Sequence, residues 1–456
     1  MHYDAIIIGS GQAGNPLAQK LASAGNKVAL IESGLLGGTC INTGCTPTKA
    51  MVASAQVAHY ARNAKHWGVH ASNVSVDLPA ILHRKGKIVE SSRNGWEKKF
   101  EGKQNPHLYH ARARFIGPKQ IQVDEATLEG DRIFIDTGAR PSIPDVPGLD
   151  SVGYLTNVSI LAQRELPAHL IVLGGGYIGL EFGQMFRRFG SDVTVIQRAS
   201  HILPNEDDDV TDELQRSLES EGIRFVLNAK VIEAKRHRTH IGVLAESSES
   251  HETICGSHLL VAAGRTPNTE DLDLEKAGVK TNAKGFIVVD DQLRTTADGI
   301  WALGDVKGGP QFTHISYNDY QIVFANVYEG KNLSTTSRIV PYAVFTDPTL
   351  GRVGLTEKAA RAHGRKLKIG KMPMSSVARA IERGETAGLM KIVVDHDTDR
   401  VLGASILSSE GGELVQILST LILAEKPYTL LKSAIYIHPT LAEGFFGLIE
   451  NVKPVE

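Results

Sequence analysis

The feature that most constrains the fold is a pattern that begins at the N-terminus and occurs again near residue 170. In the first copy, an apolar run over Tyr3–Gly9 leads into Gly9-Ser10-Gly11-Gln12-Ala13-Gly14, and a helical stretch extends to about Ala24. A second apolar run, Lys27–Glu32, ends on an acidic residue. Strand, glycine-rich turn, helix and strand, in this order, form the layout that holds a dinucleotide diphosphate on a helix N-terminus.

The second copy repeats this layout in full. Leu170–Leu173 leads into Gly174-Gly175-Gly176-Tyr177-Ile178-Gly179, a helical stretch extends to Phe189, and Asp192–Ile196 has the pattern of a strand. One glycine-rich turn alone would be weak evidence, but the recurrence of the whole unit predicts two dinucleotide-binding folds in one chain.

The two units differ at the position that contacts the ribose. The first unit has Glu32 there, and the equivalent position of the second is Gln197, followed by Arg198. A 2′-phosphate repels a carboxylate and attracts a guanidinium, so the second unit favours NADPH. Gly179 keeps the third glycine that is typical of NAD sites, and use of NADH stays open.

A stretch just after the first unit, Gly37–Lys49, holds two of the three cysteines, Cys40 and Cys45. Their spacing on an ideal helix would leave the Cα atoms too far apart for easy bridging. Gly44 and Pro47 allow the turn to distort, and a helix N-terminus at this point would lower the thiol pKa.

Three interpretations of the cysteine pair differ in what they require. A zinc site needs four ligands, and no second Cys/His pair has a suitable spacing. Two unrelated buried thiols are the second interpretation. We favour a redox-active disulfide, because close cysteine pairs in a reducing compartment are typically catalytic, redox-sensing or metal-binding.

Length and charge exclude several classes of protein. A chain of 456 residues is expected to form roughly two to four domains. The net charge of −2 provides no field that would recruit nucleic acid or an anionic membrane. No basic region precedes the first apolar run, which is too short for an export signal or a spanning helix, so we expect a cytoplasmic protein.

The remaining chain is predicted to hold two long helices over residues 48–104 and a C-terminal α+β region. Short strands are expected around Tyr109–Phe115, Gln120–Val123, Arg132–Ile135 and Ile300–Leu303. Leu389–Val394 and Val401–Leu407 flank a polar turn, as in a hairpin. Three side-chain environments are also predicted: Cys255 buried, Glu206–Asp209 solvated, and Met372 and Met374 in a core.

Together, Gly37–Lys49, the two glycine-rich units, Gly304-Asp305 and His438-Pro439-Thr440 resemble the class I pyridine nucleotide–disulfide oxidoreductases. This group includes glutathione reductase, lipoamide dehydrogenase and mercuric reductase. The resemblance implies an α/β fold with two Rossmann-like dinucleotide-binding domains and a C-terminal α+β dimerisation domain. The implied domains are residues 1–147 for FAD, 148–268 for NAD(P)H, 269–336 completing the FAD site, and 337–456 at the dimer interface.

The resemblance also implies roles for the cysteine pair and its neighbours. Cys45 resembles the flavin-proximal thiol of the family, and Cys40 resembles the interchange thiol that attacks the substrate. Lys49 and Glu181 match the pair near the flavin N5, where the hydride arrives; Glu181 could instead be a surface or capping carboxylate.

His438 and Glu443 lie close together near the C-terminus. A histidine before proline is biased to extended geometry, and the peptide bond between them could be cis. The pKa of a histidine side chain lies near physiological pH, which suits general acid–base catalysis. Glu443 could orient the imidazole ring. With seventeen histidines, a structural role is the default for any one of them. In the family, this pair enters the other subunit's active site and protonates the interchange thiolate, which implies an obligate homodimer.

The predicted cofactor contacts follow from the motifs and the resemblance. For FAD they are Gly9, Gly11, Gly14, Glu32, Thr39, Lys49, Ala113, Thr137, Gly138 and Asp305. For NAD(P)H they are Gly174, Gly176, Gly179, Gln197, Arg198 and Gly264. No metal ligands are predicted.

The acceptor is the least determined part of the prediction. Residues 305–314 and 341–348 look closest to mercuric-reductase-like flavoproteins, including the reactive-chlorine-resistance branch. The last seven residues hold no vicinal cysteine pair, no N-terminal metal-binding domain is expected, and His438 is kept, which together disfavour Hg(II). A disulfide, a quinone or a metal ion such as Cu(II) stays open. The alternatives are a dihydrolipoyl dehydrogenase subunit of a 2-oxo acid dehydrogenase complex and glutathione reductase. A non-enzymatic flavoprotein would have lost a catalytic residue, and none is missing.

Overall fold

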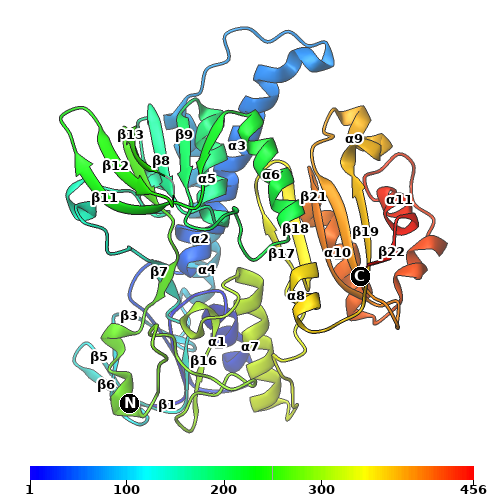
Figure 1. Ribbon diagram of the computed structural model, residues 1–456. Helices are drawn as coiled ribbons and strands as arrows, with labels where there is room; N and C mark the ends of the chain where they lie inside the picture. Colours follow the sequence, from blue (N-terminus) through cyan, green and yellow to red (C-terminus); the bar gives the residue numbers. More distant parts are fainter. Residues whose placement is uncertain (249, 456) are drawn as a thin grey trace. The chain divides into compact units, whose positions relative to one another are not determined.

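The structure is a computed structural model that describes residues 1–248 and 250–455. Its internal contacts divide the chain into two compact units, each assembled from segments that are distant in sequence (Figure 1). Unit 1 comprises Met1–Ala50, Ala80–Ser142 and Gly264–Arg338. Unit 2 comprises Met51–Pro79, Ile143–Ala263 and Ile339–Glu456.

Unit 1 is built on a seven-stranded mixed sheet. Its strands are β1 (His2–Ile8), β2 (Val28–Glu32), β3 (His107–His110), β4 (Ala113–Gly117), β5 (Gln120–Val123), β6 (Ala126–Ile135) and β16 (Ile300–Ala302). They follow the order β3-β2-β1-β6-β5-β4, and β16 also pairs with β6. The pairs of β1 with β2 and β6, of β2 with β3 and of β6 with β16 are parallel, whereas β4, β5 and the start of β6 form an antiparallel meander.

Helices and short elements complete unit 1. They are α1 (Gly14–Ser23), α2 (Gly38–Asn42), α4 (Leu78–Phe100), α7 (Thr313–Tyr328), η4 (Glu270–Leu272), η5 (Leu274–Ala277) and η6 (Gly304–Lys307). A two-stranded ribbon of β7 (Ala139–Pro141) and β15 (Arg265–Pro267) belongs to the same unit. Helix α3 (Cys45–Asn63) begins in unit 1 and continues into unit 2, and the first two residues of α4 also belong to unit 2.

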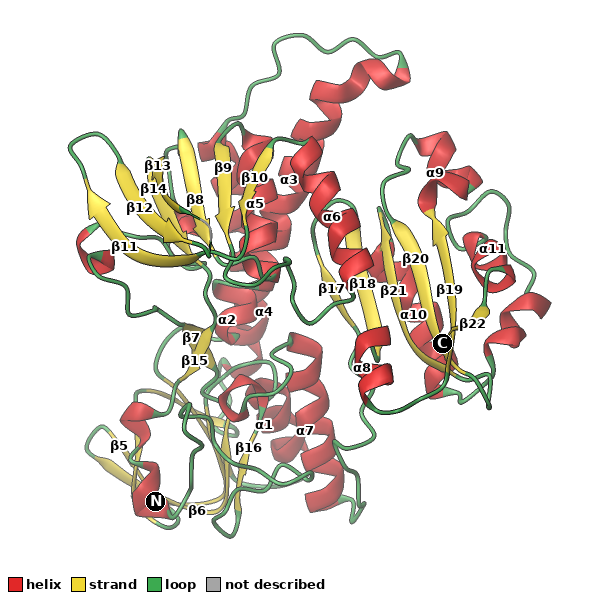
Figure 2. Ribbon diagram, in the orientation of Figure 1, coloured by secondary structure: helices red, strands yellow, loops and turns green. Residues whose placement is uncertain are grey.

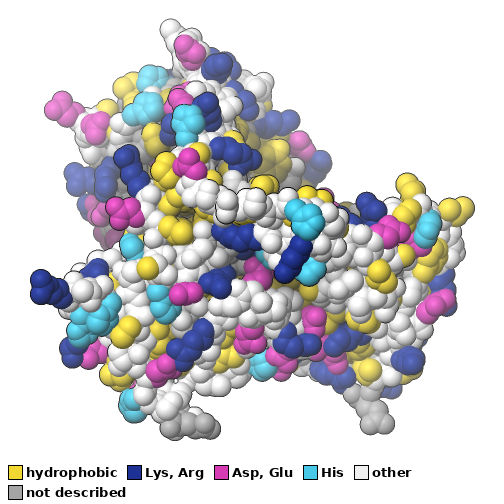
Figure 3. Space-filling model, turned by 90° about the horizontal axis from the view of Figure 1, so that it is seen from above, with side chains coloured by type: hydrophobic (Ala, Val, Ile, Leu, Met, Phe, Trp, Pro, Cys, Tyr) yellow, Lys and Arg dark blue, Asp and Glu magenta, His cyan; other side chains and the backbone are white. Residues whose placement is uncertain are grey.

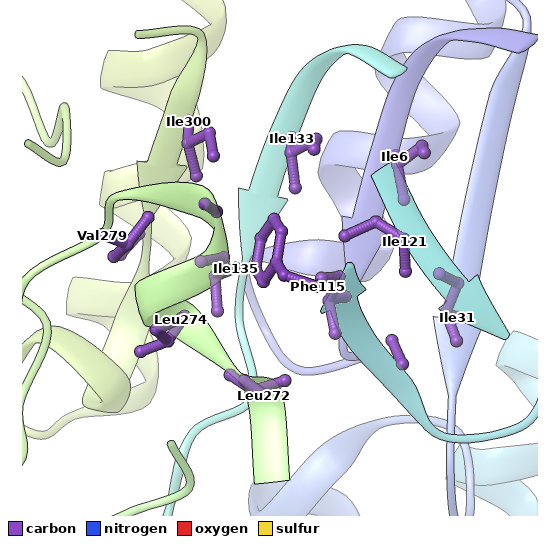
Figure 4. Packing of buried hydrophobic residues seen from close by; sticks show 14 of the residues in the cluster. Ile6, Ile31, Phe115, Ile121, Ile133, Ile135, Leu272, Leu274, Val279 and Ile300 are labelled. Carbon is purple, nitrogen blue, oxygen red and sulfur yellow. The ribbon is translucent and has the colours of Figure 1, made fainter. Parts of the chain in front are cut away.

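The first apolar run of the sequence becomes β1, which is buried on both of its faces. Successive side chains of a strand point to opposite faces, so Ile6 and Ile8 join one core cluster, and Ala5 and Ile7 join another. The first cluster gathers around Phe115 and reaches the η4–η5 segment (Figure 4). The second cluster contains residues of α1 and α7. Burial on both faces explains why the Ala5–Ile8 stretch of this strand is apolar throughout rather than alternating.

The first part of unit 2 contains the second glycine-rich unit. A parallel sheet in the order β10-β9-β8-β14 is formed by β8 (His169–Leu173), β9 (Asp192–Ile196), β10 (Ile223–Val226) and β14 (His258–Val261). Beside it are an antiparallel sheet and two helices: β11 (Lys230–Arg236), β12 (Ile241–Glu246), β13 (His251–Gly256), α5 (Tyr177–Phe189) and α6 (Asp208–Ser220). Short 3₁₀ helices in this part are η1 (Ala64–Trp67), η2 (Leu149–Ser151) and η3 (Ile160–Ala162).

The C-terminal part of unit 2 is an antiparallel sheet with helices beside it (Figure 2). The strands are β17 (Tyr342–Val344), β18 (Thr349–Gly354), β19 (Leu367–Pro373), β20 (Leu389–Asp395), β21 (Val401–Ser408) and β22 (Lys453–Val455), in the order β17-β18-β21-β20-β19-β22. The helices are α8 (Glu357–Ala362), α9 (Ala378–Arg383), α10 (Gly411–Leu423), α11 (Gly444–Glu450), η7 (Met374–Ser376) and η8 (Tyr428–Ser433). Every residue of β20 is buried, and Met372 and Met374 belong to the core cluster, as predicted.

The predicted fold class is confirmed, since two sheets of Rossmann type precede an antiparallel C-terminal sheet. The predicted hairpin is the β20–β21 pair. One strand prediction was wrong, because Tyr109–Phe115 is not one strand. Its first residues belong to β3, which pairs with β2, and its last residues belong to β4, which pairs with β5.

The distribution of charged side chains on the surface agrees with the low net charge. On the face shown in Figure 3, basic and acidic side chains are interspersed. Among the described residues, no helix is both long and apolar enough to cross a membrane.

Candidate active site

The Gly37–Lys49 segment forms two consecutive helices that are interrupted at Gly44. Helix α2 ends before Gly44 and carries Cys40, whereas α3 begins immediately after it, at Cys45. A Cβ atom added to Gly44 would lie 2.8 Å from the carbonyl oxygen of Thr39, so the break depends on glycine. The predicted distortion at Gly44 is confirmed.

The two cysteine side chains are hydrogen-bonding neighbours. The hydrogen bond with Cys45 is the main cause that raises the pKa of the Cys40 thiol above its ordinary value, and partial burial is the second cause. Two thiols in contact lose their protons in sequence, because the first negative charge opposes the second. Thr313 and Lys49 act in the opposite sense and lower this pKa, and Thr313 Oγ1 lies 3.3 Å from Cys45 Sγ.

This corrects the expectation that a helix N-terminus would lower the thiol pKa of the pair. Only Cys45 occupies the first position of α3, and Cys40 belongs to the preceding helix. For Cys40, the neighbouring thiol and burial outweigh the nearby positive charge of Lys49.

The first glycine-rich turn is packed too closely for side chains. A Cβ atom on Gly9 or Gly14 would overlap a backbone carbonyl oxygen, and one on Gly11 would lie 2.7 Å from Asp136 Oδ2. Gly9 also has a φ of 104°. Because α1 starts at Gly14, the N-terminal amides of the helix follow the turn directly. A dinucleotide diphosphate fits a cradle of this kind.

A polar residue at the end of the second strand holds the glycine-rich turn in both units: Glu32 is the last residue of β2, and Gln197 directly follows β9. Glu32 Oε2 accepts hydrogen bonds from the backbone N–H of Ser10 at 2.9 Å and from its hydroxyl at 2.6 Å. In the second unit, Gln197 Oε1 accepts from the backbone N–H of Gly175 at 3.2 Å. The predicted equivalence of Glu32 and Gln197 is therefore structural as well as positional.

The other predicted FAD residues come from several elements of unit 1, including the loop at Thr137 and Gly138 and the η6 segment that holds Asp305. Thr137 Oγ1 donates to the carbonyl of Asn268 at 2.8 Å, and Asn268 Nδ2 donates to the carbonyl of Thr137 at 2.8 Å. Asp305 lies 3.3 Å from Arg265, and burial raises the pKa of its carboxyl despite that cation. Unit 1 contains all ten predicted FAD residues: Gly9, Gly11, Gly14, Glu32, Thr39, Lys49, Ala113, Thr137, Gly138 and Asp305.

The predicted NAD(P)H residues lie mainly in unit 2. Gly174 and Gly176 lie in the turn between β8 and α5, Gly179 lies in the first turn of α5, and a Cβ atom on Gly174 or Gly179 would overlap a backbone oxygen. Arg198 is exposed just after β9. Gly264 is the exception, because it is the first residue of the third segment of unit 1.

Helix α5 turns one face toward the segment that links β17 to β18. The backbone N–H of Phe345 donates to Glu181 Oε1 at 2.9 Å, and the backbone N–H of Asp347 donates to Gln184 Oε1 at 2.8 Å. Arg188, one turn further along, lies 2.9 Å from Asp347. Glu181 is 3% exposed, so it is a buried, hydrogen-bonded carboxylate, and the alternative that it is a surface residue is excluded.

His438 and Glu443 form the predicted pair in unit 2. His438 Nδ1 lies 2.8 and 3.0 Å from the two carboxylate oxygens of Glu443, and the His438–Pro439 peptide bond is cis. The hydrogen bond with Glu443 raises the pKa of His438, and the same bond lowers the pKa of Glu443. The His438 side chain is 71% exposed, and Ile435 and Ile437 beside it are also exposed.

Comparisons with known proteins identify this arrangement. Residues 3–319 match the sequence model of the family described as "Pyridine nucleotide-disulphide oxidoreductase", and residues 340–447 match the dimerisation domain of the same family. The chain belongs to the pyridine nucleotide-disulphide oxidoreductases. It is therefore a flavoprotein disulfide reductase of an FAD-dependent, pyridine nucleotide-using family, and its dimerisation domain indicates a homodimer.

Relatives of this oxidoreductase cover nearly its whole length. It is 40% identical over 99% of both chains to the "Probable pyridine nucleotide-disulfide oxidoreductase RclA" of Escherichia coli strain K12. It is 35% identical to a mercuric reductase of Lysinibacillus sphaericus, over 97% of this chain and 81% of the relative. A solved structure, the "Cu(II) complex of HOCl-induced flavoprotein disulfide reductase RclA from Escherichia coli", superposes with a TM-score of 0.90 at 39% identity. That superposition covers 98% of this chain and all of the other.

Some features of the oxidoreductase differ from the sequence predictions or were missed. Cys255 is exposed rather than buried. Glu206 and Asp207 are buried rather than solvated, since they pair with basic residues of the C-terminal sheet. Thr313, beside Cys45, gave no signal in the sequence, because only the fold brings α7 to α3. Within residues 1–248 and 250–455, no group of three or more His, Cys, Asp or Glu side chains could hold a metal ion.

Proposed function

We propose that this enzyme passes two electrons from NADPH, by way of FAD, to a Cys40–Cys45 disulfide and from there to an external acceptor. The observation that carries the proposal is the contact between the two thiols at the α2–α3 break, within the unit that also holds the FAD turn. FAD, when bound, supplies two-electron chemistry between the nicotinamide and the sulfur pair. We assign the flavin-facing position to Cys45 and the substrate-facing position to Cys40.

The chain's own residues provide the sulfur chemistry. Reduction of the disulfide takes up two electrons and two protons and yields two thiols. Cys40, as thiolate, then attacks the acceptor, and Cys45 closes the disulfide again. The positive charge of Lys49 favours the thiolate form of Cys40 against the opposing effects of burial and Cys45. Glu181, held by Phe345, is assigned with Lys49 to the flavin side of the site.

We propose that His438 is the proton carrier for Cys40. Glu443 holds Nδ1, so Nε2 of the ring remains to exchange a proton with the sulfur. Glu443 also stabilises the imidazolium that forms when His438 takes a proton from Cys40. The exposure of His438 supports a role toward the partner subunit, with each active site completed by both chains of the homodimer.

The preference for NADPH is supported by the second glycine-rich unit. Gln197 presents no carboxylate to a 2′-phosphate, and the exposed Arg198 follows it directly. The nearby Arg187 and Arg188 are already engaged: Arg187 binds Asp192, and Arg188 is buried against Glu221. Arg198 is therefore the arginine we assign to the phosphate.

For the acceptor, we propose a thiophilic metal ion, with Cu(II) first, or a small disulfide. A dithiol reduces two Cu(II) ions to Cu(I) and becomes a disulfide with the loss of two protons. Thiolates prefer Cu(I) as soft ligands. The solved relative is a Cu(II) complex, which supports testing this ion first. Oxidation of dihydrolipoamide by NAD⁺ is the rival reaction, and Gln197 argues against it.

The proposal includes the domain boundaries and the location. We assign residues 1–147 and 269–336 to the FAD part, 148–268 to the NADPH part and 337–456 to the dimer interface. A cytoplasmic location fits a cysteine pair that must be reduced to work.

The deciding experiment is a turnover panel with the purified holoenzyme. NADPH and NADH would each be offered with Cu(II), glutathione disulfide, lipoamide, Hg(II) and a quinone. The proposal expects NADPH to be preferred and Cu(II) or glutathione disulfide to be reduced fastest. NAD⁺-coupled oxidation of dihydrolipoamide as the fastest reaction would instead establish the rival. A Cys40→Ser variant that keeps the wild-type rate would reject the role of the sulfur pair.

A further inference from the structure

A buried carboxyl group that takes no part in the proposed electron relay lies beneath the first glycine-rich turn. Asp136 directly follows β6 and is 6% exposed. Its Oδ2 accepts a hydrogen bond from the backbone N–H of Gly14 at 2.7 Å, and the backbone N–H of Ala13 also donates to the carboxyl. The side chain therefore uses amides at the start of α1, the helix whose N-terminus follows the predicted diphosphate cradle.

The carboxyl group contacts two of the segments that are predicted to bind FAD. Added Cβ atoms on Gly11 and Gly14, in the turn after β1, would lie 2.7 and 3.1 Å from Oδ2. An added Cβ atom on Gly304, at the turn after β16, would lie 2.7 Å from Oδ1. Asp136 thus fills the space between the glycine-rich turn and the turn that carries Asp305.

The charges around Asp136 are mostly compensated elsewhere. Asp319 lies 3.2 Å from Lys307 and 2.6 Å from Arg338, and Asp305 lies 3.3 Å from Arg265. Glu32 reaches the same turn from β2 through Ser10. Among residues 1–248 and 250–455, no cation lies within salt-bridge distance of Asp136, and the backbone amides of Gly14 and Ala13 donate to its carboxyl group.

We propose that Asp136 is a positioning residue that holds the FAD turn as a neutral carboxylic acid, and that its ionisation weakens FAD binding. A negative charge on Asp136 would repel the carboxylates of Asp305 and Asp319. It would also repel the diphosphate, because both would lie near the same backbone amides. Neutral Asp136 keeps the two turns together without that repulsion. The inference concerns FAD retention and does not depend on the identity of the acceptor.

The direction of the pH effect follows from proton linkage. Burial raises the pKa of Asp136 well above its ordinary value, and Asp305 and Asp319 act in the same direction, whereas the hydrogen bonds from the backbone amides of Gly14 and Ala13 oppose this rise. A bound diphosphate adds negative charge and raises the pKa further. FAD binding therefore takes up a proton at pH values between these two pKa values, and affinity falls by up to about tenfold per pH unit as pH rises through that window.

The test is the release of FAD from the holoenzyme, followed by the recovery of free flavin fluorescence between pH 5.5 and 9.5. The wild type should release FAD increasingly fast as pH rises. Asp136→Asn keeps the shape and the contact with Gly14 but cannot ionise, so its release rate should stay near the low-pH wild-type value. Asp298→Asn, an exposed carboxyl in the same unit, is the matched control and should follow the wild type.

Three results would overturn the inference. A wild-type release rate that does not change with pH shows that no ionisation is linked to FAD. If the release rate of Asp136→Asn rises with pH as much as that of the wild type, the ionisation belongs to another group. Faster release at low pH in the wild type reverses the proposed sign. Asp136→Ala, which loses both the charge and the packing, should release FAD faster than wild type even at low pH, and equal retention would reject the positioning role.

Discussion

Replacing Arg352 by alanine should destabilise unit 2 far more than loss of an ordinary ion pair, because its partner would remain as a buried charge. Arg352 and Glu206 are each 3% exposed, and Arg352 Nε lies 3.1 Å from Glu206 Oε2. Arg352 also donates to the carbonyl of Ala404 at 2.9 Å. Breaking a buried pair from one side costs about 3–5 kcal/mol. At roughly 2–4 °C per kcal/mol for a domain of 150–250 residues, the unfolding midpoint should fall on the order of 10 °C.

The assay is thermal unfolding of the holoenzyme at fixed protein concentration and saturating FAD. Arg224→Ala is the matched control, because Arg224 and Glu252 are 2.5 Å apart but are 53% and 40% exposed. Exposed pairs contribute about 1 kcal/mol or less, so this variant should unfold near the wild type. Glu206→Gln/Arg352→Met should recover most of the lost stability. Equal midpoints for Arg352→Ala and Arg224→Ala would refute the reasoning.

Two further changes probe the proton carrier and the coenzyme site. Glu443→Gln removes the interaction that raises the pKa of His438. The pH–rate profile for acceptor reduction should therefore shift to lower pH. An unchanged profile would show that His438 does not carry the proton. Arg198→Ala should raise the KM for NADPH about tenfold or more, since hydrogen bonds to charged groups contribute about 1.5–3 kcal/mol, and should leave the KM for NADH unchanged. Equal effects on both coenzymes would remove Arg198 from the phosphate site.

Local signals in the sequence were sufficient for the glycine-rich units and the cysteine pair. An added Cβ atom on Gly14 or Gly179 would overlap the carbonyl oxygen of the residue five positions earlier, so both positions require glycine, and Gly44 is restricted in the same way by Thr39. The equivalence of Glu32 and Gln197 followed from spacing alone. These features depend on neighbours along the chain, so the sequence predicts them directly.

Features that depend on distant partners could not be predicted. Glu206 and Asp207 had the pattern of a solvated acidic run, but Arg352 and Lys391 of the C-terminal sheet neutralise and bury them. Asp136 had no recognisable role until β6 and the glycine turn were seen in contact.

The central claim is that electrons from NADPH reduce a disulfide between Cys40 and Cys45. The most direct measurement is the number of accessible thiols per chain before and after anaerobic addition of one equivalent of NADPH to the oxidised holoenzyme. The account predicts one reactive thiol before, from the exposed Cys255, and three after, together with a long-wavelength thiolate–flavin band that is lost in Cys45→Ser. No gain in thiols on reduction, or a Cys45→Ser variant that keeps the band, would contradict it.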